Sequence, residues 1–241
     1  MQAVCVIIKC IRMEWYGLLY SLLGGGMDIR EVIIYILSSL AVVFLTMPVH
    51  EFAHGFAAVR LGDNTPRYQG RLTLNPLAHI DYLGALCIIF FGFGWAKPVQ
   101  IDARNFKNPK AGMAITALAG PLANIIVAFI FLLLYNIVGL FPLSEITLYI
   151  SIFLRYIASI NVSLAVFNLI PIPPLDGSRL LSAALPYKQY YALMRYERYI
   201  FFGLLALLWL GVLDVPLSFL SGKLFTLLSN LADLPFMFLL R

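Results

Sequence analysis

The apolar run from Ala111 to Leu140 contains no lysine, arginine, aspartate or glutamate. A run of about 20 such residues is long enough to cross the hydrocarbon core of a bilayer as a helix. Of the 241 residues, 61% are hydrophobic and 12% are charged, and the mean hydropathy is +0.89. These values exclude a soluble domain and predict an all-α polytopic membrane protein, because helices satisfy their own backbone hydrogen bonds in lipid.

Further apolar runs divide the chain into spans. The first three long runs are expected to form a three-helix core, and the last two are expected to form additional C-terminal spans, either two short spans or segments that lie partly in the interface. The five runs are Val32–Arg60, Ala111–Leu140, Ile146–Leu169, Tyr199–Leu213 and Pro216–Leu231.

A sixth apolar segment, Tyr82–Ala96, is short for a span and contains three glycines. Basic residues gather in 60–110 and again from Arg179 to Arg198, and both regions can be cytoplasmic only if Tyr82–Ala96 enters the membrane and returns. We therefore expect a small re-entrant element of β-strand and half-helix. The alternating residues Arg71–Asn75 are expected to form its short strand.

Two histidines four residues apart, His50 and His54, lie in the first span with Glu51 beside them. Residues at this spacing project from one face of a helix, so both imidazoles can bind one metal ion while Glu51 handles water there. The alternative is a pair of packed, hydrogen-bonded histidines. Ionisable groups at bilayer depth are costly and mark function, which favours metal binding.

A catalytic zinc site typically has three protein ligands, so a third ligand is needed. The remaining histidine, His79, follows Pro76 in a turn-like stretch and is better explained as a loop hydrogen-bonder. Asp176 ends a proline-rich stretch after the third long run. Such unwound backbone near membrane depth should line a polar cavity. The alternative role for Asp176 is N-cap of the helix that follows it.

Three motifs in this order resemble the site-2 protease family of intramembrane zinc metalloproteases. They are His50 to His54, Ala119 to Asn124, and the sequence FNLIPIPPLDG from Phe167 to Gly177. The segments Arg71 to Asp81 and Gly92 to Val99 are similar to the family as well, and the resemblance covers residues 30 to 185. It implies a protease of the compact form, without PDZ or CBS domains.

The resemblance also implies the roles of individual residues and one Zn²⁺ per chain. His50, His54 and Asp176 would be the zinc ligands, Glu51 the general base, and Asn168 the donor to the developing oxyanion. The alternative for Asn168 is an interhelical hydrogen bond, which is also expected of Asn161. Substrate contact is expected of a set of six residues: Arg71, Leu72, Thr73, Leu74, Asn75 and Asn124.

The expected function is hydrolysis of peptide bonds within or near transmembrane segments. Two alternatives are a polytopic transporter, which would show paired repeats, and a non-catalytic metal-binding scaffold, which would have lost a ligand or Glu51. The expected partners are a transmembrane protein substrate, the lipid bilayer, and a regulatory membrane protein or a second copy of the chain. No nucleic acid is expected, because the lysines and arginines behind the net charge of +5 lie between apolar runs.

We divide the chain into a membrane-associated N-terminal extension (1–26), a metalloprotease core (27–185) and C-terminal membrane segments (186–241). The three cysteines form no CxxC pair, so neither a disulfide framework nor a cysteine zinc site is indicated. The expected location is a prokaryotic cell membrane, with the site toward the cytoplasmic side.

Overall fold

The computed structural model describes residues 29–79, 81 and 97–237, and these residues form helices and connecting loops. Four helical segments are long and apolar enough to cross a membrane, which confirms a multi-pass membrane protein. They are Ile33–Arg60, Pro109–Val138, Glu145–Asn168 and Asp214–Asp233. The N-terminal extension 1–26 and the expected re-entrant segment Tyr82–Ala96 lie outside the described residues.

The first span consists of α2 (Ile29–Ala41), a π-helical turn η1 (Val42–Thr46) and α3 (Met47–Arg60). Pro48 has no N–H, so the carbonyl of Phe44 loses its usual helical donor, and the N–H of Met47 reaches back five residues to Val42. The wider turn therefore ends at Thr46, about one helical turn before His50.

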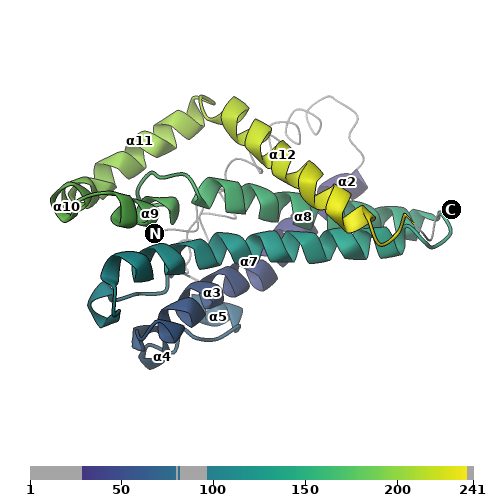
Figure 1. Ribbon diagram of the computed structural model, residues 1–241. Coiled ribbons are helices and arrows are strands. Elements are labelled where there is room, and N and C mark those ends of the chain that lie inside the picture. Colours follow the sequence, from purple (N-terminus) through teal and green to yellow (C-terminus); the bar gives the residue numbers. More distant parts are fainter. Residues whose placement is uncertain (1–28, 80, 82–96, 238–241) are drawn as a thin grey trace.

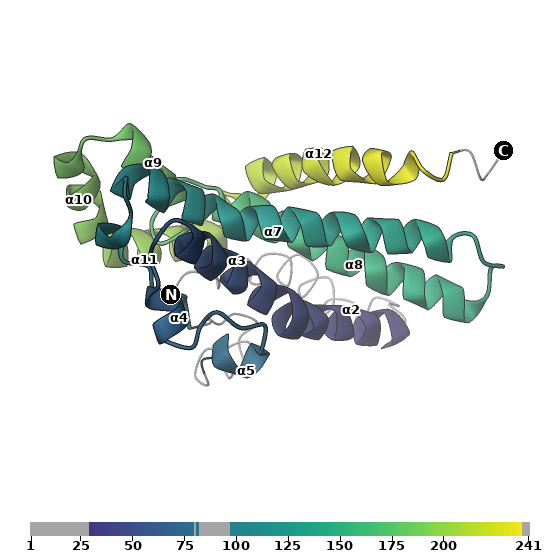
Figure 2. The same ribbon diagram turned by 60° about the horizontal axis from the view of Figure 1, so that its bottom comes forward.

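The longest helix, α7 (Pro109–Val138), is central to the fold and contacts α3, α8 (Glu145–Asn168), α9 (Gly177–Ala184) and α12 (Asp214–Asp233). Figure 1 shows α7 and α8 side by side and antiparallel, and Figure 2 shows α12 and α3 on different sides of α7. Side chains cap both long helices. Asn108 accepts the N–H of Ala111, and Ser144 forms a capping box with Thr147.

Small residues let α3 approach α7 closely. The buried positions of α7 include Gly112, Thr116 and Gly120, which follow one another at intervals of four residues and so lie on one helical face. Helices in membranes pack closely where small residues meet, since the backbones can then come near each other. The outward face of α7 instead exposes large apolar side chains such as Leu122, as expected of a surface in lipid.

The remaining helices are too short to span a membrane. They are α4 (Thr65–Tyr68), α5 (Pro76–His79), the 3₁₀ turn η2 (Ala103–Asn105), α10 (Tyr187–Arg195) and α11 (Glu197–Trp209). Helix α11 has 13 residues, fewer than the roughly 20 needed to span, so α12 is the C-terminal span among the described helices. Figure 1 places α4, α9 and α10 at one end of the bundle, away from the α7–α8 turn. The lysines and arginines of the loop after α3 and those of α9 and α10 therefore lie at the same end of the bundle.

The strand expected at Arg71–Asn75 is absent: this segment is an irregular loop, and the described residues contain no strand. Polar side chains in this segment form local hydrogen bonds with the backbone, which compete with the backbone hydrogen bonds of a β-sheet. The hydroxyl of Thr73 accepts the N–H of Asn75 at 3.1 Å, and the side chain of Asn75 accepts the N–H of Leu77 at 3.0 Å. A second expectation was also wrong. Asn161 donates to the carbonyl of Ile157 in its own helix, at 2.9 Å, and not to another helix.

Candidate metal centre

Three donor atoms from two parts of the chain meet in the interior. On α3, Nε2 of His50 and Nε2 of His54 lie 3.0 Å apart. Oδ2 of Asp176, which directly precedes α9, lies 3.3 Å from the first and 3.1 Å from the second. All three residues are buried, at 2% to 5% exposed. Among the described residues, they are the group of histidine and acidic side chains that can hold a metal ion.

The geometry of this triangle fits a tetrahedral zinc ion. Zinc bonds to nitrogen and oxygen are about 2.0 to 2.1 Å long, so two ligand atoms of a tetrahedron lie about 3.3 Å apart. The three measured separations are close to that value. Two imidazole nitrogens and one carboxylate oxygen are also ligands that catalytic zinc sites use, and they leave a fourth position open.

A backbone carbonyl orients His54. Its Nδ1 donates to the carbonyl of Thr116 on α7, at 2.6 Å. A carbonyl can only accept, so the proton of the neutral imidazole is on Nδ1 and the lone pair of Nε2 faces His50 and Asp176. Thr116 could not be recognised from the sequence, because a backbone carbonyl is present in every residue type.

The carboxylate of Asp176 faces the two histidines and does not cap the helix that follows it. Asp176 precedes α9, but its side chain makes no capping hydrogen bond to that helix. The chain before it turns back sharply: a Cβ atom at Gly177 would lie 2.3 Å from the carbonyl oxygen of Leu169. Only glycine fits this close approach, which brings the end of α8 and the start of α9 together and directs Asp176 toward α3.

Glu51 and two asparagines are also buried. Glu51 is 3% exposed, and its Oε2 accepts the backbone N–H of Val99 at 3.0 Å. Asn168, at the end of α8, is 1% exposed, and Asn124 on α7 is 2% exposed. The Oδ1 atoms of both asparagines lack a hydrogen-bond partner in the described part of the chain.

The other sequence candidates lie apart from the triangle. His79 ends the short helix α5, and its Nε2 lies 2.9 Å from the carbonyl of Thr73 in the preceding loop, so it makes a local hydrogen bond as expected. Arg71 donates to the carbonyl of Ala78. Leu72 extends toward α3, since its Cδ1 would lie 3.5 Å from a Cβ at Gly55.

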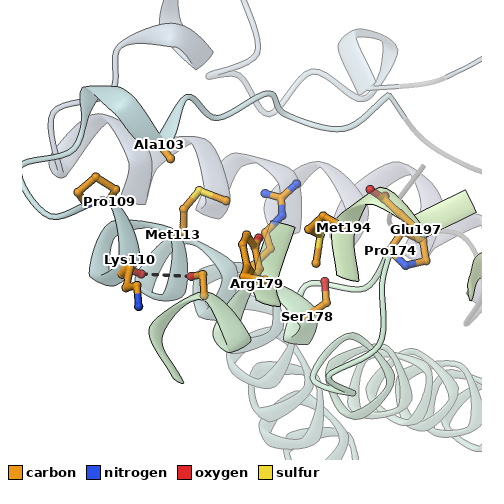
Figure 3. A pocket seen from close by; sticks show the side chains of 11 residues that line it. Ala103, Pro109, Lys110, Met113, Pro174, Ser178, Arg179, Met194 and Glu197 are labelled. Atoms are coloured by element: carbon orange, nitrogen blue, oxygen red, sulfur yellow. Dashed lines mark hydrogen bonds between the residues drawn. The ribbon is translucent and has the colours of Figure 1, made fainter. Parts of the chain in front are cut away.

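A cavity of about 380 Å³ opens beside Asp176, between the start of α7 and helices α9 to α11. Figure 3 shows Pro174 and Ser178, which flank Asp176 in sequence, on its wall together with Arg179 and Glu197. Pro174 is the residue of the proline-rich stretch that lines this cavity. The cavity lies at the end of the bundle that carries the basic loops.

The comparisons with known proteins agree with this site. The family model "Peptidase family M50" matches residues 136–211. "Putative zinc metalloprotease YwhC" of Bacillus subtilis (strain 168) is 39% identical over 155 residues, which are 63% of this chain and 69% of that protein. "Putative zinc metalloprotease MJ0611" of Methanocaldococcus jannaschii is 30% identical over 63% of this chain and 72% of that protein.

A third relative matches over a smaller share of its own length. "Putative zinc metalloprotease Rip2" of Mycolicibacterium smegmatis is 30% identical over 55% of this chain and 51% of its own length. No solved structure matches the chain significantly. The similarity to YwhC and MJ0611 spans more than two thirds of each protein, and the His-His-Asp triangle supplies the matching chemistry. The chain therefore belongs to peptidase family M50, the site-2 protease family of zinc metalloproteases.

Proposed function

We propose that the chain hydrolyses peptide bonds within or near transmembrane segments, with zinc held by His50, His54 and Asp176. The observation that carries this proposal is the triangle of donor atoms beside buried Glu51, on a helix long enough to span the membrane. Proteases of family M50 cleave membrane-protein substrates. The substrate of this chain is accordingly a transmembrane protein.

We assign the remaining roles to Glu51 and Asn168, two buried side chains. A zinc ion supplies Lewis-acid chemistry, which acidifies water and polarises a carbonyl. Glu51 accepts a proton from the attacking water and returns it to the leaving amine. Asn168 donates its amide N–H to the carbonyl oxygen as negative charge develops there. One water is added across the peptide bond, and a carboxylate and an amine are released.

The substrate must unwind locally, because the carbonyls of an intact helix are tied up in internal hydrogen bonds. We assign contact with the unwound segment to Arg71–Asn75 and Asn124. Leu72 reaches the surface of α3 near Gly55, one turn beyond Glu51, which supports this placement. Thr73→Pro should then impair cleavage without removing zinc. Cleavage at the wild-type rate would reject the assignment.

The three-helix core consists of the first span, α7 and α8, and corresponds to the proposed unit 27–185. Residues 186–241 add the C-terminal membrane segments, and 1–26 are a membrane-associated extension. The shared position of the two basic regions supports a cytoplasmic location for that end of the bundle. With this topology, we propose that Tyr82–Ala96 enters the membrane and returns to the same side. We also propose that the protein is located in a prokaryotic cell membrane.

The test is cleavage of a membrane-embedded reporter by purified wild-type protein and by Glu51→Gln. The amide cannot accept a proton from water, so the variant should lose cleavage by on the order of a hundredfold or more. Its zinc content should remain that of the wild type, since Glu51 is not in the triangle. Cleavage that survives the substitution would falsify the proposed role of Glu51.

A further inference from the structure

The backbone N–H of Val99 contacts Glu51 from a segment 48 residues away in sequence. The donor nitrogen lies 3.0 Å from Oε2, and both residues are only 3% exposed. A hydrogen bond to an ionised carboxylate is stronger than one between neutral groups and fixes the acceptor's orientation. This contact therefore holds one oxygen of Glu51 in place and leaves Oε1 to exchange a proton with water.

The segment that carries Val99 is anchored by Asp63. This residue is fully buried, with an exposed fraction of 0%. Its Oδ2 accepts the backbone N–H of Asp102 at 2.8 Å, and its Oδ1 accepts the side-chain N–H of Asn105 at 2.7 Å. The same Oδ1 also accepts the N–H of Thr65 at 3.0 Å. Asp63 thus joins the turn after α3 to the loop that carries Val99.

Two glycines allow this close junction. Gly62 has a φ of +111°, in the left-handed region that favours glycine, and a Cβ there would lie 3.2 Å from the carbonyl oxygen of Asn105. A Cβ at Gly55 would lie 3.6 Å from Cγ1 of Val99. The Val99 segment therefore crosses α3 one turn beyond Glu51, and Asp63 binds it where α3 ends.

We propose that the Val99 N–H is the positioning group for the general base, and that Asp63 is the positioning residue that keeps Val99 in place. The inference rests on the proposed function, in which Glu51 moves the proton. Neither Val99 nor Asp63 touches the substrate. Both act through the orientation of Glu51. Removing either group should therefore lower kcat and leave substrate affinity and zinc binding unchanged.

The first experiment compares Val99→Pro with Val99→Ala in the purified full chain. Proline lacks the N–H and alanine keeps it. The kcat of the proline variant should be lower than that of the alanine variant by at least about tenfold, the usual lower range for loss of an orienting partner. KM should agree within about twofold in the two variants, and zinc per chain should be equal.

The second experiment removes the anchor. Asp63→Asn deletes the carboxylate, and Asp102→Asn is the matched control because it removes a carboxylate from the same loop while keeping the N–H that Asp63 accepts. The kcat loss should be several-fold larger for Asp63→Asn, again with zinc retained. A loss confined to KM, or equal losses in the two variants, would overturn the role of Asp63.

A double-mutant cycle separates positioning from general destabilisation. The carboxylate of Glu51→Asp is one methylene shorter and no longer meets the Val99 N–H, so Val99→Pro should have little further effect on kcat in that background. An undiminished effect, or zinc loss in Val99→Pro, would show that the segment serves folding and would reject the inference. Failure of the proposed function has a different signature, a wild-type chain that binds no zinc and cleaves no membrane-embedded reporter, so the two failures are distinguishable.

Discussion

Gly120 on α7 and His54 on α3 approach so closely that a Cβ atom at position 120 would lie 2.3 Å from Nε2 of the imidazole. The same Cβ would lie 2.6 Å from Cε1 of His50. The close approach of the two helices therefore sets the space around the candidate ligands. The donor atoms themselves come from α3 and from Asp176, the residue directly before α9.

Gly120→Ala should consequently lose zinc, because the added methyl group would displace both imidazoles from the triangle. We expect zinc per chain to fall to well under half of the wild-type value. Gly222→Ala on α12 is the matched control, since a Cβ at that helical glycine meets nothing within 4 Å. Metal analysis of the two purified variants checks the prediction, and normal zinc in Gly120→Ala would contradict the close packing described above.

Asn168→Ala should reduce kcat by on the order of a hundredfold, the usual effect of removing an oxyanion donor. Zinc content and KM should change little. Asn161→Ala is the matched control: it removes a buried asparagine of the same helix whose Nδ2 donates to its own helix, so it should lower thermal stability with a much smaller effect on kcat. Equal effects of the two substitutions on kcat would assign Asn168 a packing role.

The pKa of Asp63 leads to a prediction about stability and pH. Burial would raise the pKa of this carboxyl, but hydrogen bonds from Thr65, Asn105 and Asp102 outweigh it, and the net shift is downward. A carboxyl with a lowered pKa in the folded state stabilises the protein above its unfolded-state pKa of about 4, and the stabilisation is lost as the pH falls through the folded-state value.

Wild type should therefore unfold at a higher temperature than Asp63→Asn at pH 6 to 8, and the difference should shrink once the pH falls below about 4. Thermal unfolding in detergent across this range is the measurement. A difference that grows as the pH falls would have the wrong sign for a carboxylate stabilised by hydrogen bonds.

The spans and the candidate ligands could be predicted from the sequence because their signals are local. Length and composition define a membrane helix, and the spacing of His50 and His54 places both on one helical face. Asp176 was identified as a candidate because a carboxylate after broken backbone suits a third ligand. These inferences depend on side-chain chemistry, which the sequence states directly.

Contacts made by backbone atoms could not be predicted in this way. Almost every residue has a backbone N–H and a backbone carbonyl, so residue type does not show which of these groups will bind a functional side chain. Tertiary packing brings the carbonyl of Thr116 to His54 and the N–H of Val99 to Glu51. The strand expected at Arg71–Asn75 was wrong for a related reason. Alternation of residue types indicates a strand, but Thr73 and Asn75 form local hydrogen bonds that an alternation pattern does not reveal.

The most direct test of the central claim is X-ray absorption at the zinc edge of the purified wild-type chain and Asp176→Ala. The wild type should contain one zinc per chain, bound by two imidazole nitrogens and oxygen ligands at about 2.0 to 2.1 Å. Asp176→Ala should lose most of that zinc, since one ligand is gone. A wild-type chain without zinc, zinc bound through sulfur, or zinc unchanged in Asp176→Ala would contradict the assignment of His50, His54 and Asp176 as its ligands.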